Sequence, residues 1–133
     1  MAKWCAGGET ITLQRLLTGT DAPTYLYVGL YLNNTEPADN ATLSSLTEVS
    51  GASYSRIAIN KSDWTITGDT AVNLLKTFTA GEDWGTITGY FITDASSGTS
   101  GDLYGVETFT SIDSPFTVYN GGNIKVTPRI IVE

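Results

Sequence analysis

The segment DWGTITGYFITD, Asp83 to Asp94, sets two glycines and three aromatic residues between two acidic residues. Such a mixture can line a sugar-binding groove or form a core strand. The alternation inside it favours the strand, because Ile87 and Phe91 fall on one face with Gly89 between them. Gly89 then allows a close neighbour or a bulge. We interpret Trp84 and the glycine after it as the turn into this strand, with the indole folded onto the end of the domain.

Further extended segments surround this one at short spacings. The clearest is Tyr25 to Leu32, which is apolar on both faces and is therefore expected at the centre of a sheet. The remaining strands are predicted at residues 54–59, 63–68, 71–80 and 102–110, and in a closing hairpin at 116–132. Val72, Leu74 and Phe78 alternate along one of these strands. The hairpin turns at an Asn-Gly-Gly sequence, and Pro128 on its second strand indicates an edge position or a bulge.

A helix is predicted only near the N-terminus, at residues 9–19. Leu13, Leu16 and Leu17 have helical spacing there, and Gly19 stands where the helix should end. Residues 1–8 show no pattern and are interpreted as an arm, which leaves 9–133 as a single domain. The predicted fold class is mainly β: an antiparallel β-sandwich or barrel-like domain with one short N-terminal helix.

Composition excludes several classes of function. The chain has no histidine and one cysteine, Cys5, which rules out histidine-based triads, the usual zinc sites and an internal disulfide framework. Fourteen acidic and seven basic residues give a net charge of −7, so no nucleic-acid partner is expected. No apolar run approaches the roughly 20 residues of a membrane span. The first residues also lack the apolar core of a secretory signal, so neither a membrane partner nor export by a signal peptide is expected.

Few residues are candidates for chemistry. Cys5 lies in the predicted arm, where catalysis is not expected. Asp94, Asp102 and Glu107 flank a Ser/Gly loop and could contribute oxygen ligands to calcium, although EF-hand spacing is absent. A pair of carboxylates distant in sequence could also meet as in a glycosidase, but solvated loop acids are the simpler interpretation. We therefore expect no cofactor, with calcium kept as the one alternative.

The order of motifs resembles a family of small tailed-bacteriophage virion structural proteins, which are often labelled tail-fibre-like. The resemblance spans residues 14–132. It is carried by TEVSGASYSR, which ends at Arg56, by Trp84-Gly85, and by Asp94 before the Ser/Gly loop. Residues 33–46 look expanded, and Pro128-Arg129 interrupts a segment that is plainer in the family. The resemblance implies a virion component assembled in the host cytoplasm, and it carries over no catalytic residue.

The leading expectation is a non-enzymatic capsid decoration or cement protein that binds the major capsid protein as a homo-oligomer, with a trimer as one arrangement. The alternative is a tail-fibre or baseplate component whose tyrosines and Trp64 stack on host-surface glycans. A small hydrolase is a distant third. The residues predicted to contact a partner are Trp4 in the arm and the loop residues Ser96, Ser97, Gly98, Thr99, Ser100 and Gly101.

Overall fold

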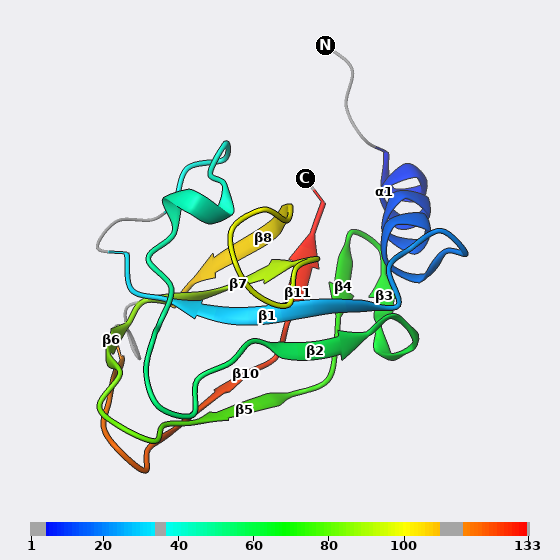
Figure 1. The fold of residues 1–133 in the computed structure, drawn as a ribbon. Coiled ribbons are helices and arrows are strands. Elements are labelled where there is room, and N and C mark those ends of the chain that lie inside the picture. The colour runs from blue at the N-terminus through cyan, green and yellow to red at the C-terminus, as the bar shows by residue number, and fades with distance from the viewer. Residues whose placement is uncertain (1–4, 34–36, 110–115, 133) are drawn as a thin grey trace.

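The computed structural model describes residues 5–33, 37–109 and 116–132, and there the chain forms layers of antiparallel strands with one helix at the side (Figure 1). The mainly β class predicted from the sequence is confirmed. The helical segment consists of α1, Ala6–Leu13, and a π-helical turn, Gln14–Thr18. The strands are β1 (Tyr25–Tyr31), β2 (Ile57–Asn60), β3 (Thr65–Thr67), β4 (Thr70–Val72), β5 (Lys76–Thr79), β6 (Gly85–Ile87), β7 (Gly89–Thr93), β8 (Leu103–Thr108), β9 (Phe116–Val118), β10 (Asn123–Val126) and β11 (Arg129–Ile131). Two 3-10 turns, Leu43–Ser45 and Lys61–Asp63, lie in the connections.

The first layer is a four-stranded sheet in the order β2-β1-β7-β8. β1 runs antiparallel to both neighbours, with Val28 opposite Ile57 on one side and Ile92 on the other. The central position predicted for residues 25–32 is therefore confirmed. β7 and β8 form the predicted hairpin, and the Ser/Gly loop is its tip.

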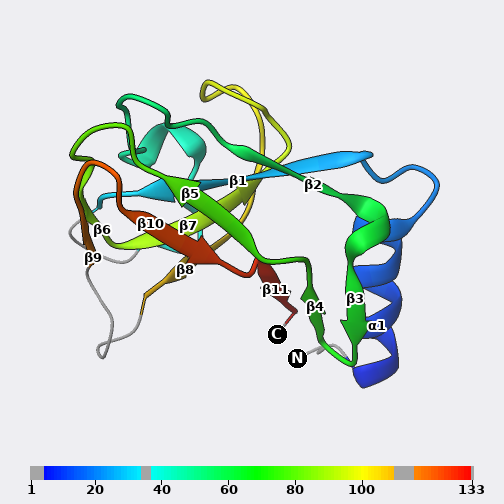
Figure 2. The same ribbon diagram turned by 90° about the horizontal axis from the view of Figure 1, so that it is seen from below.

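The second layer consists of three short ribbons: β11-β4-β3, β10-β5 and β6-β9. Seen from below, β5 and β10 lie across β1 and β7 (Figure 2). The main core between the layers includes Val28 and Ile92 from the first layer and Phe78 and Ile124 from the second. The fold is thus a β-sandwich whose second layer is divided.

A smaller core covers the outer face of the first layer. It contains Tyr31 and Phe91, which are fully buried, and Leu43 from a 3-10 turn in the connection after β1. Apolar side chains on both faces of β1 and β7 therefore have separate cores to fill, which is why the sequence of β1 is apolar throughout.

The segment from Asp83 to Asp94 is two strands that belong to different layers. The extended segment is interrupted at Thr88. The N–H and the hydroxyl of Thr88 both donate to the carbonyl of Tyr31, at 2.9 and 3.1 Å. Ile87 consequently packs in the main core and Phe91 in the smaller one. The prediction that these two residues share one face is wrong, because the alternation restarts after Thr88.

The strand predicted at residues 71–80 is confirmed but interrupted between β4 and β5. Val72 lies opposite Arg129 and Lys76 opposite Val126. Three residues, 73–75, thus face only two, 127–128, and the extra residue is a bulge. The expected edge position near Pro128 is also confirmed, since β11 ends its sheet.

The bulge changes which residues point into the core. Ala71 and Asn73 are buried before it, and Phe78 and Ala80 are buried after it. Leu74 is 55% exposed. The predicted shared face of Val72, Leu74 and Phe78 is therefore wrong, because a strand with one extra residue reverses its alternation.

The closing segment is not a hairpin. β9 pairs with β6 and β10 pairs with β5, so the strands on either side of the Asn-Gly-Gly turn have different partners. The backbone of the turn forms hydrogen bonds with Ala80, directly after β5. Gly121 N–H donates to Ala80 O at 2.8 Å, and Ala80 N–H donates to Gly122 O at 2.9 Å. These bonds replace the ones that a hairpin would make.

The helix begins at Ala6, so residues 6–8 of the predicted arm are helical. The first bond runs from Glu9 N–H to Cys5 O, at 2.9 Å. Two consecutive glycines are poor helix formers, which is why the sequence shows no helix there. The helix ends at Thr18, directly before Gly19, as predicted. None of the described helices is long and apolar enough to span a membrane.

Gly89 and Gly105 provide a matched test of packing in the first layer. A Cβ on Gly89 would meet the Tyr31 hydroxyl and the backbone carbonyl of Glu107, whereas a Cβ on Gly105 would meet nothing within 4 Å. We expect Gly89→Ala to lower the free energy of unfolding by about 1–3 kcal/mol, as overpacking does. Gly105→Ala should change it by less than about 0.5 kcal/mol. Urea unfolding measures both, and equal losses would contradict the described packing.

Candidate functional site

An ion pair with a buried arginine and a partly exposed glutamate lies at the base of the Ser/Gly loop. Arg56 precedes β2, and Glu48 forms an isolated bridge with Tyr31 at the end of β1. The guanidinium donates through Nε to Glu48 Oε2 at 2.9 Å and through NH2 to Oε1 at 2.8 Å. The side chain of Arg56 is 3% exposed and that of Glu48 27%. This two-point geometry fixes both the distance and the plane of the pair.

Tyr54 completes a triad with this pair. Its hydroxyl donates to Glu48 Oε2 at 2.6 Å and accepts the backbone N–H of Leu30 at 3.0 Å. Burial, followed by the hydrogen bond to Glu48, raises the pKa of the Tyr54 phenol far above its usual value. The Tyr54 ring stacks on the ring of Phe78, with 6.1 Å between the ring centroids. It also contacts the ring of Trp84 edge-on, with 5.5 Å between the centroids. The triad is thereby tied to the first layer and to the main core.

The same arginine holds the Ser/Gly loop. Its NH1 donates to Ala95 O at 2.8 Å, and its NH2 donates to Gly98 O at 2.7 Å. The guanidinium also lies 5.2 Å from the ring centroid of Phe91, within cation–π range. One side chain thus connects the carboxylate, the smaller core and the loop backbone.

The loop predicted to contact a partner is exposed but anchored. Ser96 to Ser100 are exposed and Gly101 is half-buried. At the base, Asp94 Oδ1 accepts the Asp102 N–H at 2.8 Å, and Thr93 donates to Asp102 O at 2.6 Å. A cavity of about 370 Å³ separates the loop from the segment of Glu48 to Arg56. Contact with a partner stays a prediction for these residues, and Trp4 lies outside the described residues.

A second triad repeats the arrangement on the other side of the first layer's hairpin. Tyr90 donates to Glu107 Oε2 at 2.8 Å and accepts the Arg129 N–H at 3.1 Å, while Arg129 NH2 donates to Glu107 Oε1 at 2.9 Å. Burial and the bond to Glu107 raise the pKa of Tyr90 well above its usual value. Here the side chain of Arg129 is 47% exposed and that of Glu107 is 37% exposed. This triad therefore joins β8 to β11 at the protein surface.

The three residues considered for calcium do not form a metal-ligating group, although Asp94 and Asp102 lie opposite each other at the base of the hairpin. Asp94 accepts from the backbone of its own hairpin, and Glu107 accepts from Tyr90 and Arg129. Across the described ranges no three acidic, cysteine or histidine side chains form a metal-ligating group. Cys5 is exposed at the start of α1.

Trp64 is not available for stacking on a glycan. Its side chain belongs to the main core and is 8% exposed. This part of the tail-fibre alternative is therefore wrong, because the indole, directly before β3, points inward.

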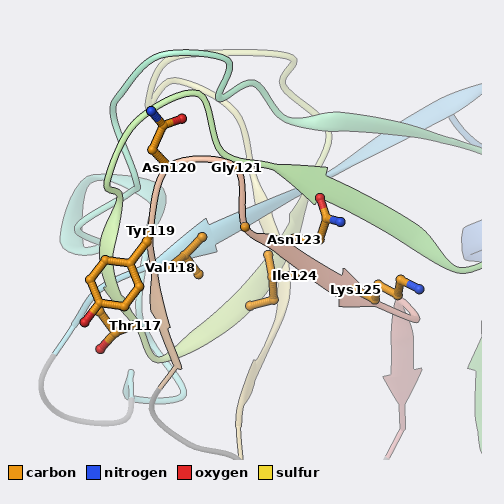
Figure 3. A pocket seen from close by; sticks show the side chains of 9 residues that line it. Thr117, Val118, Tyr119, Asn120, Gly121, Asn123, Ile124 and Lys125 are labelled. Atoms are coloured by element: carbon orange, nitrogen blue, oxygen red, sulfur yellow. The ribbon is translucent and has the colours of Figure 1, made fainter.

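Sequence reasoning did not identify the surface around the turn from β9 to β10. A cavity of about 670 Å³ there is lined by residues 117–125 (Figure 3). Tyr119 stands clear of the ribbon in this view and is 65% exposed. The available signal was a tyrosine followed by three turn-forming residues, a position where an aromatic ring has no core to enter.

The comparisons with known proteins now bear on identity. The model of a family described as Podophage GP4 fiber I protein gp80 matches residues 8–131. The chain belongs to this family. Neither a curated protein nor a solved structure matches it.

Membership of the gp80 fibre family makes the chain a phage structural protein of the fibre type. The resemblance to virion proteins inferred from the sequence is confirmed. The family description favours the tail-fibre alternative over the capsid decoration protein that the sequence placed first. The motif TEVSGASYSR that carried the resemblance contains Glu48, Tyr54 and Arg56, which are the complete first triad.

The two triads provide a matched test of what the buried arginine contributes. Arg56→Met removes the guanidinium from Glu48, which then accepts only from the Tyr54 hydroxyl, and leaves two loop carbonyls without their donor, so we expect a loss of about 2–4 kcal/mol in unfolding free energy. The value lies below the full cost of a broken buried pair because Glu48 is partly exposed. Arg129→Met breaks the exposed pair and should cost about 0–1 kcal/mol. Hydrogen exchange should also accelerate at residues 95–102 in the first variant only. Equal losses, or an unchanged loop, would contradict this assignment.

The raised tyrosine pKa values predict instability in alkali. An unfolded tyrosine loses its proton near pH 10, whereas Tyr54 and Tyr90 keep theirs in the folded protein above that pH. Above pH 10 the unfolded state therefore binds fewer protons, and the free energy of unfolding falls as the pH rises. Tyr54→Phe and Tyr90→Phe should each reduce this slope between pH 9 and 11. Urea unfolding across that range measures it, and a slope unchanged in both variants would exclude the two phenols as its source.

Proposed function

We propose that this chain is a non-enzymatic structural component of a phage tail fibre. The observation that carries the proposal is the match of the fibre family over residues 8–131. A capsid decoration role, the first expectation from the sequence, has no comparable support.

The geometry of the described residues supports a structural role. Two carboxylates accept hydrogen bonds from their own neighbours: Glu48 from Tyr54 and Arg56, and Glu107 from Tyr90 and Arg129. In both triads the tyrosine and arginine hold the ionised carboxylate in place, which suits a rigid building block more than a general acid.

A fibre component also needs contacts with other virion proteins, and we propose that copies of the chain associate as a trimer. β8 has one neighbour among the described strands, so its outer backbone groups can accept another strand. Leu74, Leu75 and Ile131 are about half exposed in and beside the ribbon of β4 and β11. These apolar side chains offer an interface that a single chain leaves in water. Native mass spectrometry should show a trimer, and a monomer at every concentration would overturn this arrangement.

Location on the particle tests the tail-fibre proposal. An antibody to the folded domain should label the tail fibres of virions of the phage that encodes the chain. Fibre-less particles prepared from the same lysate provide the control and should remain unlabelled. Label spread over the capsid in many copies would overturn the proposal in favour of decoration.

A further inference from the structure

Asn120 is followed by Gly121 in the turn between β9 and β10, and no other asparagine of the chain precedes a glycine. Asparagine is one of the thermolabile residues, because its side-chain amide can be attacked by the backbone nitrogen of the next residue. A glycine in the next position has no Cβ that would hinder this approach. The sequence therefore places the most reactive asparagine of the chain in the Asn-Gly-Gly turn.

The side-chain amide of Asn120 is accessible to water. The residue is exposed, and its side chain projects from the head of the turn (Figure 3). This amide forms no hydrogen bond with another described residue, whereas the backbone N–H of Asn120 donates to Asp83 Oδ1 at 2.8 Å. The side chain can therefore rotate toward the nitrogen of Gly121 without losing a partner.

Two other described asparagines are exposed, but both are less suited to this reaction. Asn123 precedes the β-branched Ile124, and its side-chain oxygen already accepts a hydrogen bond. Asn40 precedes Ala41, whose methyl group hinders the attack. Asn40 therefore provides an internal reference that has the same access to water as Asn120.

The fold restrains the attacking nitrogen. Gly121 N–H donates to Ala80 O at 2.8 Å, and Gly122 N–H donates to Tyr119 O at 2.8 Å. Gly121 also has φ +84°, a conformation that favours glycine. Its nitrogen can reach the Asn120 side chain only when the turn separates from Ala80, so the rate depends on local opening of the structure.

We propose that Asn120 is a site of spontaneous deamidation, and that the hydrogen bond from Gly121 N–H to Ala80 O limits its rate in the folded protein. Gly121 N forms a bond to Asn120 Cγ, the bond from Cγ to Nδ2 breaks, and Nδ2 leaves as ammonia with the proton from Gly121 N. Water then opens the cyclic imide at either carbonyl, which gives aspartate or isoaspartate. No atom is oxidised or reduced. The inference goes beyond the proposed fibre role and does not depend on it.

Both products disturb the turn. Isoaspartate places the Cβ of residue 120 in the main chain, so the connection between β9 and β10 becomes longer by one atom. The hydrogen bonds between this turn and Ala80 depend on the present length. Aspartate adds a carboxylate on the residue whose N–H Asp83 accepts, and two like charges at this distance repel each other. We therefore expect deamidation to lower the stability of the domain.

The experiment incubates the full chain at neutral pH, once folded and once unfolded in urea, and follows each asparagine by peptide mass spectrometry. The replacement of an amide by an acid raises the peptide mass, and the isoaspartyl peptide elutes separately. In the unfolded chain, Asn120 should convert faster than Asn40 and Asn123. In the folded chain, Asn120 should still convert, but at least about tenfold more slowly, because the reaction requires local opening.

Two neighbouring acids provide matched variants that test the restraint. Asp83 holds the Asn120 N–H, whereas Glu82 is also exposed but forms no hydrogen bond with another described residue. Asp83→Ala should accelerate deamidation of the folded chain about fivefold, which is the effect of one lost hydrogen bond. Glu82→Ala should leave this rate unchanged. In urea both variants should convert as the unmodified chain does.

Asn120→Gln tests the consequence for stability. Glutamine keeps an amide and the backbone N–H, but its longer side chain closes a ring much more slowly. After incubation, the unmodified chain should contain a population with a lower midpoint of thermal unfolding, and Asn120→Gln should not.

Three results would overturn the proposal. The first is no conversion at Asn120 in the folded chain by the time the unfolded chain has converted completely. The second is equal rates at Asn120 and Asn40 in the unfolded chain. The third is the same rate in Asp83→Ala as in Glu82→Ala when both are folded. Particle labelling tests the fibre role separately, so the two proposals can fail independently.

Discussion

The guanidinium of Arg56 is the point through which the parts of this domain are held together. It neutralises Glu48, contacts Phe91 and ties down two carbonyls of the hairpin tip. Such a charge could not remain buried without its carboxylate. Tyr54 connects the pair to the main core through its ring and to β1 through its hydroxyl. This group of three residues thus connects the main core, the smaller core and the loop through side chains, in addition to the backbone pairing.

Much of the fold could be predicted from periodicity. Residues 25–32 were recognisable as a central strand because β1 is apolar on both faces, and each face enters a core. Failures occurred where a strand changes partner: at Thr88, at the bulge of residues 73–75 and at the turn of residues 119–122. In each place the deciding interaction is a backbone hydrogen bond to a segment distant in sequence, such as Thr88 to Tyr31 or Gly121 to Ala80. Local sequence patterns do not contain such partners.

Local sequence patterns likewise predicted only part of the candidate site. The Ser/Gly composition indicated an exposed loop, and its exposure is as predicted. Its attachment to Arg56 joins residues 39 and 42 positions apart, which spacing alone cannot reveal. The motif containing Glu48, Tyr54 and Arg56 was visible as a family marker, but its meaning as a hydrogen-bonded unit required the fold. Tyr119 was not singled out from the sequence, although the three turn-forming residues after it were a local signal of its exposure.

The segment from β4 to β5 has one residue more than the segment from β10 to β11 that it pairs with. Changes in chain length should therefore have different effects in this ribbon and in the Ser/Gly loop. Deleting one of residues 73–75 would make the two sides equal and would remove the bulge, together with the local bend and twist that a bulge gives the strand between β4 and β5. The tip at Ser96 to Ser100 pairs with no described strand, so its length is not coupled to a partner, although Arg56 NH2 donates to Gly98 O within it. Variation in chain length should therefore accumulate at the tip, and the ribbon should keep its residue count across the family.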